Sequence, residues 1–171
     1  MDTYNILHNE ILRQGEEGLE FNFRLFENLS SASFINRPLY HYVYCDTSIT
    51  AVSTLKNNDY VIKCYEAIKR EILGGQNANS LLPWFYNRMM QVVVTSIISG
   101  IFNPSLEMKY KDRKKEFNDF LEIGIVDETL KSKAYYDLST GRRCVLFLIK
   151  RRQILVLYLL GIIRRYQKTH L

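Results

Sequence analysis

The chain has few of the residues that mark extracellular or redox-active proteins. Only three of its 171 residues are cysteines, Cys45, Cys64 and Cys144, and no pair has metal-ligand or thiol–disulfide spacing. Residues 1–5 are polar, and no charged start is followed by an apolar core, so we expect no secretory signal. Together these absences predict a reduced, cytoplasmic protein.

The C-terminal segment lacks both a long apolar run and acidic residues. Its apolar runs, 144–149 and 154–163, fall short of the ~20 residues that cross a bilayer. Residues 142–171 contain eight Lys or Arg and no Asp or Glu, whereas the first 141 residues have 15 basic and 18 acidic residues, a net charge of −3. The net charge of +5 therefore belongs to one segment, which predicts a local anionic partner and no nucleic acid.

What the chain does contain is typical of a folded, mainly helical protein. Hydrophobic residues make up 47% of the sequence and aromatic residues 13%, which is enough for a core. Apolar periodicity and breaker residues predict six helices and one early strand. The expected helices cover residues 16–28, 57–73, 84–101 (capped by Ser80), 105–121, 127–136 and 142–167, and the expected strand covers residues 33–44.

The expected strand has an alternating pattern that follows a polar stretch. Tyr40 and Tyr42 would face one side and His41 the other. Pro38 cannot donate a ladder hydrogen bond, so we expect the strand at the edge of a sheet.

An acidic pair begins the first expected helix. Gly15 is followed by Glu16 and Glu17. A carboxylate held on the first turn of a helix suits a general base that removes a proton from a hydroxyl group. The alternative is that two acids only complement the positive end of the helix dipole.

A second motif follows at a defined distance. Tyr40, His41 and Tyr42 lie 23 to 25 positions after Glu17, and Ser48 opens a Ser-Ile-Thr loop. Aromatic faces suit sugar rings, and an imidazole can reach a phosphate oxygen or a metal. The alternative is that the tyrosines cover a sheet face and that His41 is a hydrogen-bonded, partly buried histidine.

Taken together, these two motifs resemble the closing part of a bacterial family 2 glycosyltransferase. The resemblance implies the C-terminal part of a GT-A α/β enzyme, followed by a helical extension. It implies Glu17 as the catalytic base, or Glu16 if Gly18 is an inserted residue. It also implies that Tyr40, His41, Tyr42 and Ser48 bind the acceptor or the leaving diphosphate, with His41 the one candidate metal contact.

The donor-binding half of such an enzyme is not in this sequence. The chain has no Asp-x-Asp metal motif and no Gly-rich phosphate loop. We therefore expect that the chain is inactive alone, and that it is either a truncated or split product or associates with a separate donor-binding chain. The complete enzyme would use a nucleotide-sugar, Mn²⁺ or Mg²⁺, and a saccharide or lipid-linked acceptor. Residues 1–56 would belong to the catalytic domain, 57–141 to the helical extension and 142–171 to a basic helix.

Two interpretations of that basic helix stay open. Residues 142–168 could lie on an anionic membrane, which would place the protein on the inner face of the cell membrane. The helix could instead be a core element with a solvated basic edge. A membrane- or partner-docking helical module without catalysis is thus the alternative to the enzyme fragment.

Overall fold

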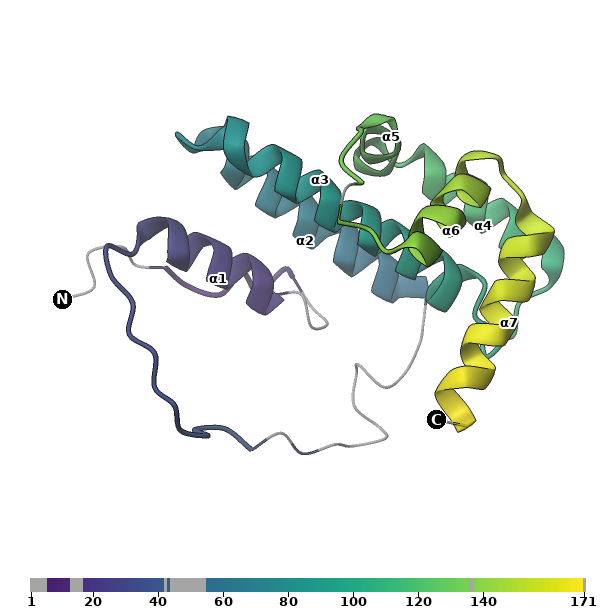
Figure 1. The fold of residues 1–171 in the computed structure, drawn as a ribbon, viewed down its shortest axis with the longest axis horizontal. Coiled ribbons are helices and arrows are strands. Elements are labelled where there is room, and N and C mark those ends of the chain that lie inside the picture. Colours follow the sequence, from purple (N-terminus) through teal and green to yellow (C-terminus); the bar gives the residue numbers. More distant parts are fainter. Residues whose placement is uncertain (1–5, 13–16, 42, 44–54, 136, 171) are drawn as a thin grey trace.

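The computed structural model describes residues 6–12, 17–41, 43, 55–135 and 137–170, and for residues 17 and 168–170 it describes the backbone alone. Over these ranges the chain is mainly helical, as predicted, and contains no strand (Figure 1). The elements are α1 (Glu17–Asn28), α2 (Leu55–Gly74), α3 (Ala78–Thr95), the π-helical segment η1 (Ser96–Ile101), α4 (Tyr110–Glu122), α5 (Gly124–Lys131), α6 (Thr140–Lys150) and α7 (Ile154–His170).

The helix formed by α3 and η1 is the centre of the bundle. Helices α2, α5 and α6 pack against α3, whereas α2, α4 and α7 pack against η1. Apolar residues of this central helix are fully buried, among them Phe85, Met89, Met90, Val93, Ile97 and Ile101. A helix that is apolar on most sides is stable only when neighbours surround it. Helices α2, α4, α5, α6 and α7 are therefore positioned by their contacts with α3 and η1, whereas α1 packs on α2.

A close contact with α2 accompanies the π-helical segment. The side-chain nitrogen Nδ2 of Asn58 lies 3.5 Å from the carbonyl oxygen of Ser96. A Cβ atom at Gly100 would lie 3.0 Å from Oδ1 of Asn58, so glycine leaves room for this buried amide. A π-helical turn disturbs the regular i→i−4 bonding, and the buried polar side chain lies where that disturbance begins.

The prediction of one continuous helix over residues 142–167 is wrong. Helix α6 ends at Lys150 and α7 begins at Ile154, with Arg152 between them at a φ angle of 51°. The two helices also contact each other, but α6 packs on α3 and α7 packs on η1. One straight helix cannot lie along both parts of the central helix and turn back on itself, so tertiary packing breaks it.

The helix predicted from residue 105 starts later, because α4 begins only at Tyr110. Arg113, which is 2% exposed, donates hydrogen bonds to the carbonyl groups of the segment between η1 and α4. Its Nη1 donates to the carbonyl oxygens of Ile101 (2.6 Å) and Asn103 (2.9 Å), and its Nε donates to that of Met108 (3.3 Å). Its Nη2 also donates to the carbonyl oxygen of Leu106. The guanidinium thus replaces the hydrogen bonds that a helix would have supplied.

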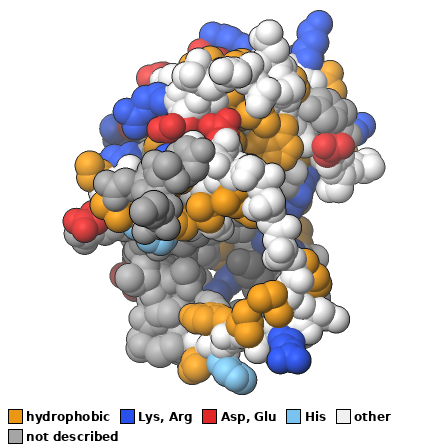
Figure 2. All heavy atoms as spheres, turned by 90° about the vertical axis from the view of Figure 1, so that its left-hand side faces the viewer, with side chains coloured by type: hydrophobic (Ala, Val, Ile, Leu, Met, Phe, Trp, Pro, Cys, Tyr) orange, Lys and Arg blue, Asp and Glu red, His pale blue; other side chains and the backbone are white. Residues whose placement is uncertain are grey.

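The N-terminal part differs in character from the bundle. Helix α1 packs along α2, and residues 29–41 and 43, named here the extended segment, then lead away from the helices (Figure 1). Hydrophobic side chains of this segment are exposed: Phe34 is 90%, Leu39 75% and Val43 82% exposed. In Figure 2 hydrophobic side chains gather below the bundle, where Figure 1 places the extended segment.

The predicted strand at residues 33–44 is therefore not seen in the described residues, which exclude 42 and 44. No backbone hydrogen bond between described residues involves residues 31–41. A strand requires a neighbour with which its N–H and C=O groups can pair, and an alternating pattern supplies no such neighbour.

Candidate functional site

The start of α1 is the place where the sequence predicts a catalytic carboxylate. The helix begins at Glu17, one residue after the predicted boundary. Glu16 and the side chain of Glu17 lie outside the described residues. The backbone nevertheless places Glu17 on the first turn, where the N–H groups of a helix favour a negative charge.

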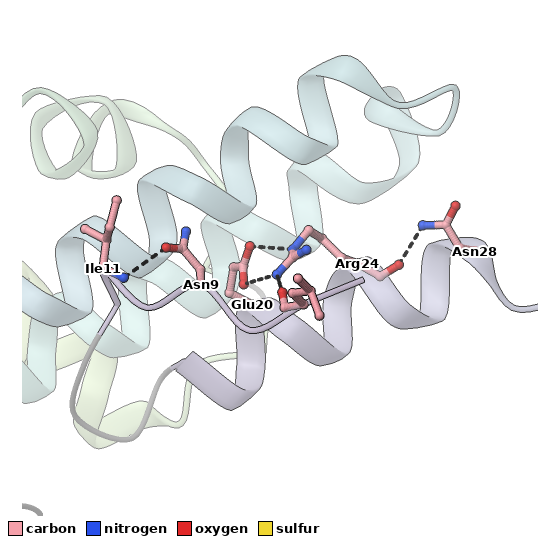
Figure 3. A network of polar contacts seen from close by, with 6 residues as sticks. Asn9, Ile11, Glu20, Arg24 and Asn28 are labelled. Carbon is pink, nitrogen blue, oxygen red and sulfur yellow. Dashed lines mark hydrogen bonds and ion pairs between the residues drawn. The ribbon is translucent and has the colours of Figure 1, made fainter. Parts of the chain in front are cut away.

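A polar network holds the N-terminal residues against α1 (Figure 3). Nε of Arg24 lies 2.6 Å from Oε1 of Glu20, and its Nη2 lies 3.0 Å from Oε2 of Glu20. The same Nη2 donates to the carbonyl oxygen of Leu7 at 2.7 Å. The hydrogen bond to Glu20, which is 3% exposed, raises the pKa of Arg24. The forked pair lies within α1, and the hydrogen bond from Arg24 to Leu7 connects the helix to the preceding chain.

An aromatic contact supports the same arrangement. The rings of His8 and Phe21 are stacked, with centroids 4.1 Å apart and planes 9° apart. Leu12 is buried in the common core of the bundle. Leu7 and His8 are therefore anchored to α1.

Tyr40 and His41 lie on the extended segment and are both exposed, with Tyr40 at 81%. Neither residue has a hydrogen bond, ion pair or ring contact with another described residue. Tyr42 and Ser48, the other predicted binding residues, lie outside the described residues. Within the described part, the chain does not gather the predicted acceptor-binding residues into one site.

The described residues also provide no metal centre. They contain no group of three or more His, Cys, Asp or Glu side chains that could hold a metal ion. This finding concerns the present chain, whereas the predicted metal ligands belong to the donor-binding half.

Sequence patterns did not predict a polar cluster that joins three helices. Glu128 of α5 accepts hydrogen bonds from Nζ of Lys69 on α2 and from the hydroxyl group of Tyr86 on α3. Partial burial acts to raise the pKa of Glu128, but the two hydrogen bonds and the charge of Lys69 outweigh it and lower this pKa. Partial burial and the bond to Glu128 raise the pKa of Tyr86 to about 12. A tyrosine that holds its proton so firmly is suited to joining helices and poorly suited to act as a base.

A second unpredicted group lies between α3 and α6. Arg88, Gln91 and Arg142 line one hollow, although Arg142 is 51 positions after Gln91. The spacing of Arg88 and Gln91 on one helical face was the only local signal. Their meeting with Arg142 follows from the packing of α6 on α3.

The C-terminal helices leave apolar side chains exposed. On α7 these form one stripe at helical spacing, Leu155, Val156, Leu159, Ile162, Ile163 and Tyr166. Phe147 is exposed on α6. No helix in the described part of the chain is both long and apolar enough to span a membrane.

Comparisons with protein-family models, with curated proteins and with solved structures found no match to this chain.

Proposed function

We propose that the chain is the acceptor-side, C-terminal part of a sugar-transferring enzyme that uses a nucleotide-sugar. It completes this activity only with a separate donor-binding α/β chain. The observation that carries the proposal is the extended segment, which follows α1 directly and exposes its hydrophobic side chains.

The extended segment has the properties of an unpaired edge strand. Its backbone groups have no partners in the described chain, so they are available to the edge of another sheet. Phe34 and Leu39 would lose their exposure to water on pairing. Pro38 limits pairing to one side, as expected for the last strand of a sheet.

The chemistry assigned to this chain is proton removal from the acceptor. Glu17 at the start of α1 would act as the general base, and the paired segment would bring Tyr40 and His41 toward the same cleft. The separate chain would bind the nucleotide and the divalent metal, which neutralises charge on the departing diphosphate. Glu16 remains the alternative base.

The first test asks whether the chain binds a donor alone. Calorimetric titration of the purified chain with nucleotide-sugars should give no heat of binding that depends on Mn²⁺ or Mg²⁺. A clear metal-dependent signal would contradict the assignment of the donor site to another chain.

The second test identifies the partner. A photo-crosslinking amino acid at position 34 or 39 should capture, in the producing cell, a chain that contains Asp-x-Asp. The same group at the exposed Leu73 on α2 is the control, because that residue lies outside the extended segment. Capture of no such chain would count against the proposal.

The captured pair then allows a test of the base. Glu17→Gln should lower the rate of transfer by about 10²-fold or more, the usual contribution of a general base. Glu27→Gln on the exposed face of the same helix should leave the rate unchanged. Equal activity of Glu17→Gln and wild type would move the role to Glu16 or remove it from this helix.

The second candidate is a membrane-docking module, on the inner face of the cell membrane. The exposed apolar stripe of α7, in a segment with eight basic and no acidic residues, supports it. The chain should then sediment with vesicles containing phosphatidylglycerol but not with purely zwitterionic vesicles. Leu159→Ser should weaken this binding severalfold, and Leu73→Ser on α2 should not.

A further inference from the structure

A hollow between α3 and α6 is a polar cavity that the proposed function does not use. It has a volume of about 280 Å³ and is lined by Val61 of α2, Arg88, Gln91, Val92 and Thr95 of α3, Ser96 of η1 and Arg142 of α6. Four elements thus converge on it. The hollow is lined by apolar as well as polar groups, and both of its charged groups are cations.

The two guanidinium groups share one neutral acceptor. Nη1 of Arg142 lies 3.1 Å from Oε1 of Gln91, and Nη1 of Arg88 lies 3.4 Å from the same oxygen. The two Nη1 atoms can therefore be no farther apart than the sum of these two distances. Neither arginine forms an ion pair with a carboxylate among the described residues. Like charges at this separation repel, and an anion between them would remove the repulsion.

Hydroxyl groups add neutral donors to the same hollow. Ser96 is 7% exposed, and its side chain forms no hydrogen bond with another described residue, although it lines the cavity. Thr95 is beside it and is exposed. The side chain of Ser96 borders the cavity, where a ligand or water can supply an acceptor for its hydroxyl group.

We infer that this hollow binds a phosphate-bearing ligand between Arg88 and Arg142. Each guanidinium offers a planar fork of N–H donors that matches two phosphate oxygens, and the hydroxyl groups can reach further oxygens. The volume is near the lower end for small-molecule sites, which suits a pyrophosphate or a small phosphate monoester. The inference does not rest on the proposed function, because no residue of α1 or the extended segment lines the hollow.

The test is a calorimetric titration of the full chain with sodium pyrophosphate at low salt. A parallel experiment uses vesicles with and without phosphatidic acid, whose headgroup carries the same chemistry. Arg88→Gln and Arg142→Gln should each weaken binding at least tenfold. Arg142→Lys keeps the positive charge but loses the forked pair of N–H donors. Its affinity for pyrophosphate should therefore lie between those of the glutamine variants and wild type.

Lys114→Gln is the matched control, because it removes one exposed positive charge on α4, which does not line the hollow. It should change binding less than twofold. The variants concern exposed side chains, and circular dichroism should show an unchanged fold.

The outcomes separate the sources of the phosphate. Binding of free pyrophosphate that depends on both arginines supports a soluble ligand. Arginine-dependent binding to phosphatidic acid vesicles alone supports a lipid headgroup. No binding to either probe, or binding that survives both arginine substitutions, would overturn the inference.

Discussion

Gly161 of α7 lies directly against the backbone of Phe102, which follows η1. A Cβ atom on residue 161 would overlap the carbonyl oxygen of Phe102 and would lie 2.9 Å from its carbonyl carbon. The ring centroids of Phe102 and Tyr158 are 6.4 Å apart, and Tyr158 lies almost one turn before Gly161 on α7. The closeness of α7 to the central helix therefore depends on the absence of a side chain at this position.

Gly161→Ala should destabilise the fold. Alanine favours helix by about 1 kcal/mol over glycine, but overpacking against a rigid carbonyl costs about 1–3 kcal/mol and more. We expect a net loss in the free energy of unfolding, measured by urea titration. Gly141→Ala in the first turn of α6 has open space around the new methyl group and should be neutral or stabilising. A Gly161→Ala protein as stable as wild type would show that α7 can move away freely.

Arg113→Lys should lower stability although it keeps the positive charge. A lysine cannot reach the carbonyl groups of Ile101, Asn103 and Met108 at once, so buried acceptors would be left unpaired. A loss of about 2–4 kcal/mol in unfolding free energy is expected. Lys114→Met, at the neighbouring exposed position, should cost less than about 0.5 kcal/mol. Equal stability of the two variants would contradict the role given to the guanidinium.

The cluster around Glu128 should make stability depend on pH on the acid side. Its pKa in the folded chain is below the ordinary value of 4.5, because Lys69 and Tyr86 hydrogen-bond to the carboxylate. The resulting stabilisation is present above the ordinary pKa and is lost as the pH falls through the folded-state pKa. Glu128→Gln should remove this part of the acid dependence of Tm, with Glu122→Gln as an exposed control. If Tm depended on pH in the same way in wild type and Glu128→Gln, the stabilising role given to this carboxylate would be contradicted.

The break between α6 and α7 predicts unequal effects at one position. Arg152 has a φ angle of 51°, where a β-branched side chain is strained and glycine is not. Arg152→Val should therefore be less stable than Arg152→Gly by about 1 kcal/mol or more. Because both variants lose the hydrogen bond from Arg152 to Asn118, their comparison isolates the backbone. Equal stabilities would indicate that the chain adopts another turn here.

Local periodicity was sufficient where a helix has one apolar face and a clear end. The predicted range 16–28 agrees with α1, and 57–73 agrees with α2 to within two residues. Both segments alternate apolar and polar residues at helical spacing, and Gly74 ends the second. Packing therefore had no need to override the local preference.

Predictions failed where the decisive partner is distant in sequence. The alternation at residues 33–44 predicted a strand, but it supplied no neighbouring strand, and no strand is seen in the described residues of this range. At Arg152 no glycine or proline marks the break between α6 and α7, since the break arises from packing on different parts of the central helix. The meeting of Arg88 with Arg142 had no local signal either, because it spans 54 positions.

The sequence by itself determined the helical class, the start of α1 at the acidic pair and the basic character of residues 142–171, since these depend on residue type and local spacing. Tertiary structure alone decided which helix is central, where the C-terminal helix breaks and which cations share one hollow. The physical reason is that burial of apolar faces fixes the order in which helices pack, and only that order brings residues from distant positions together.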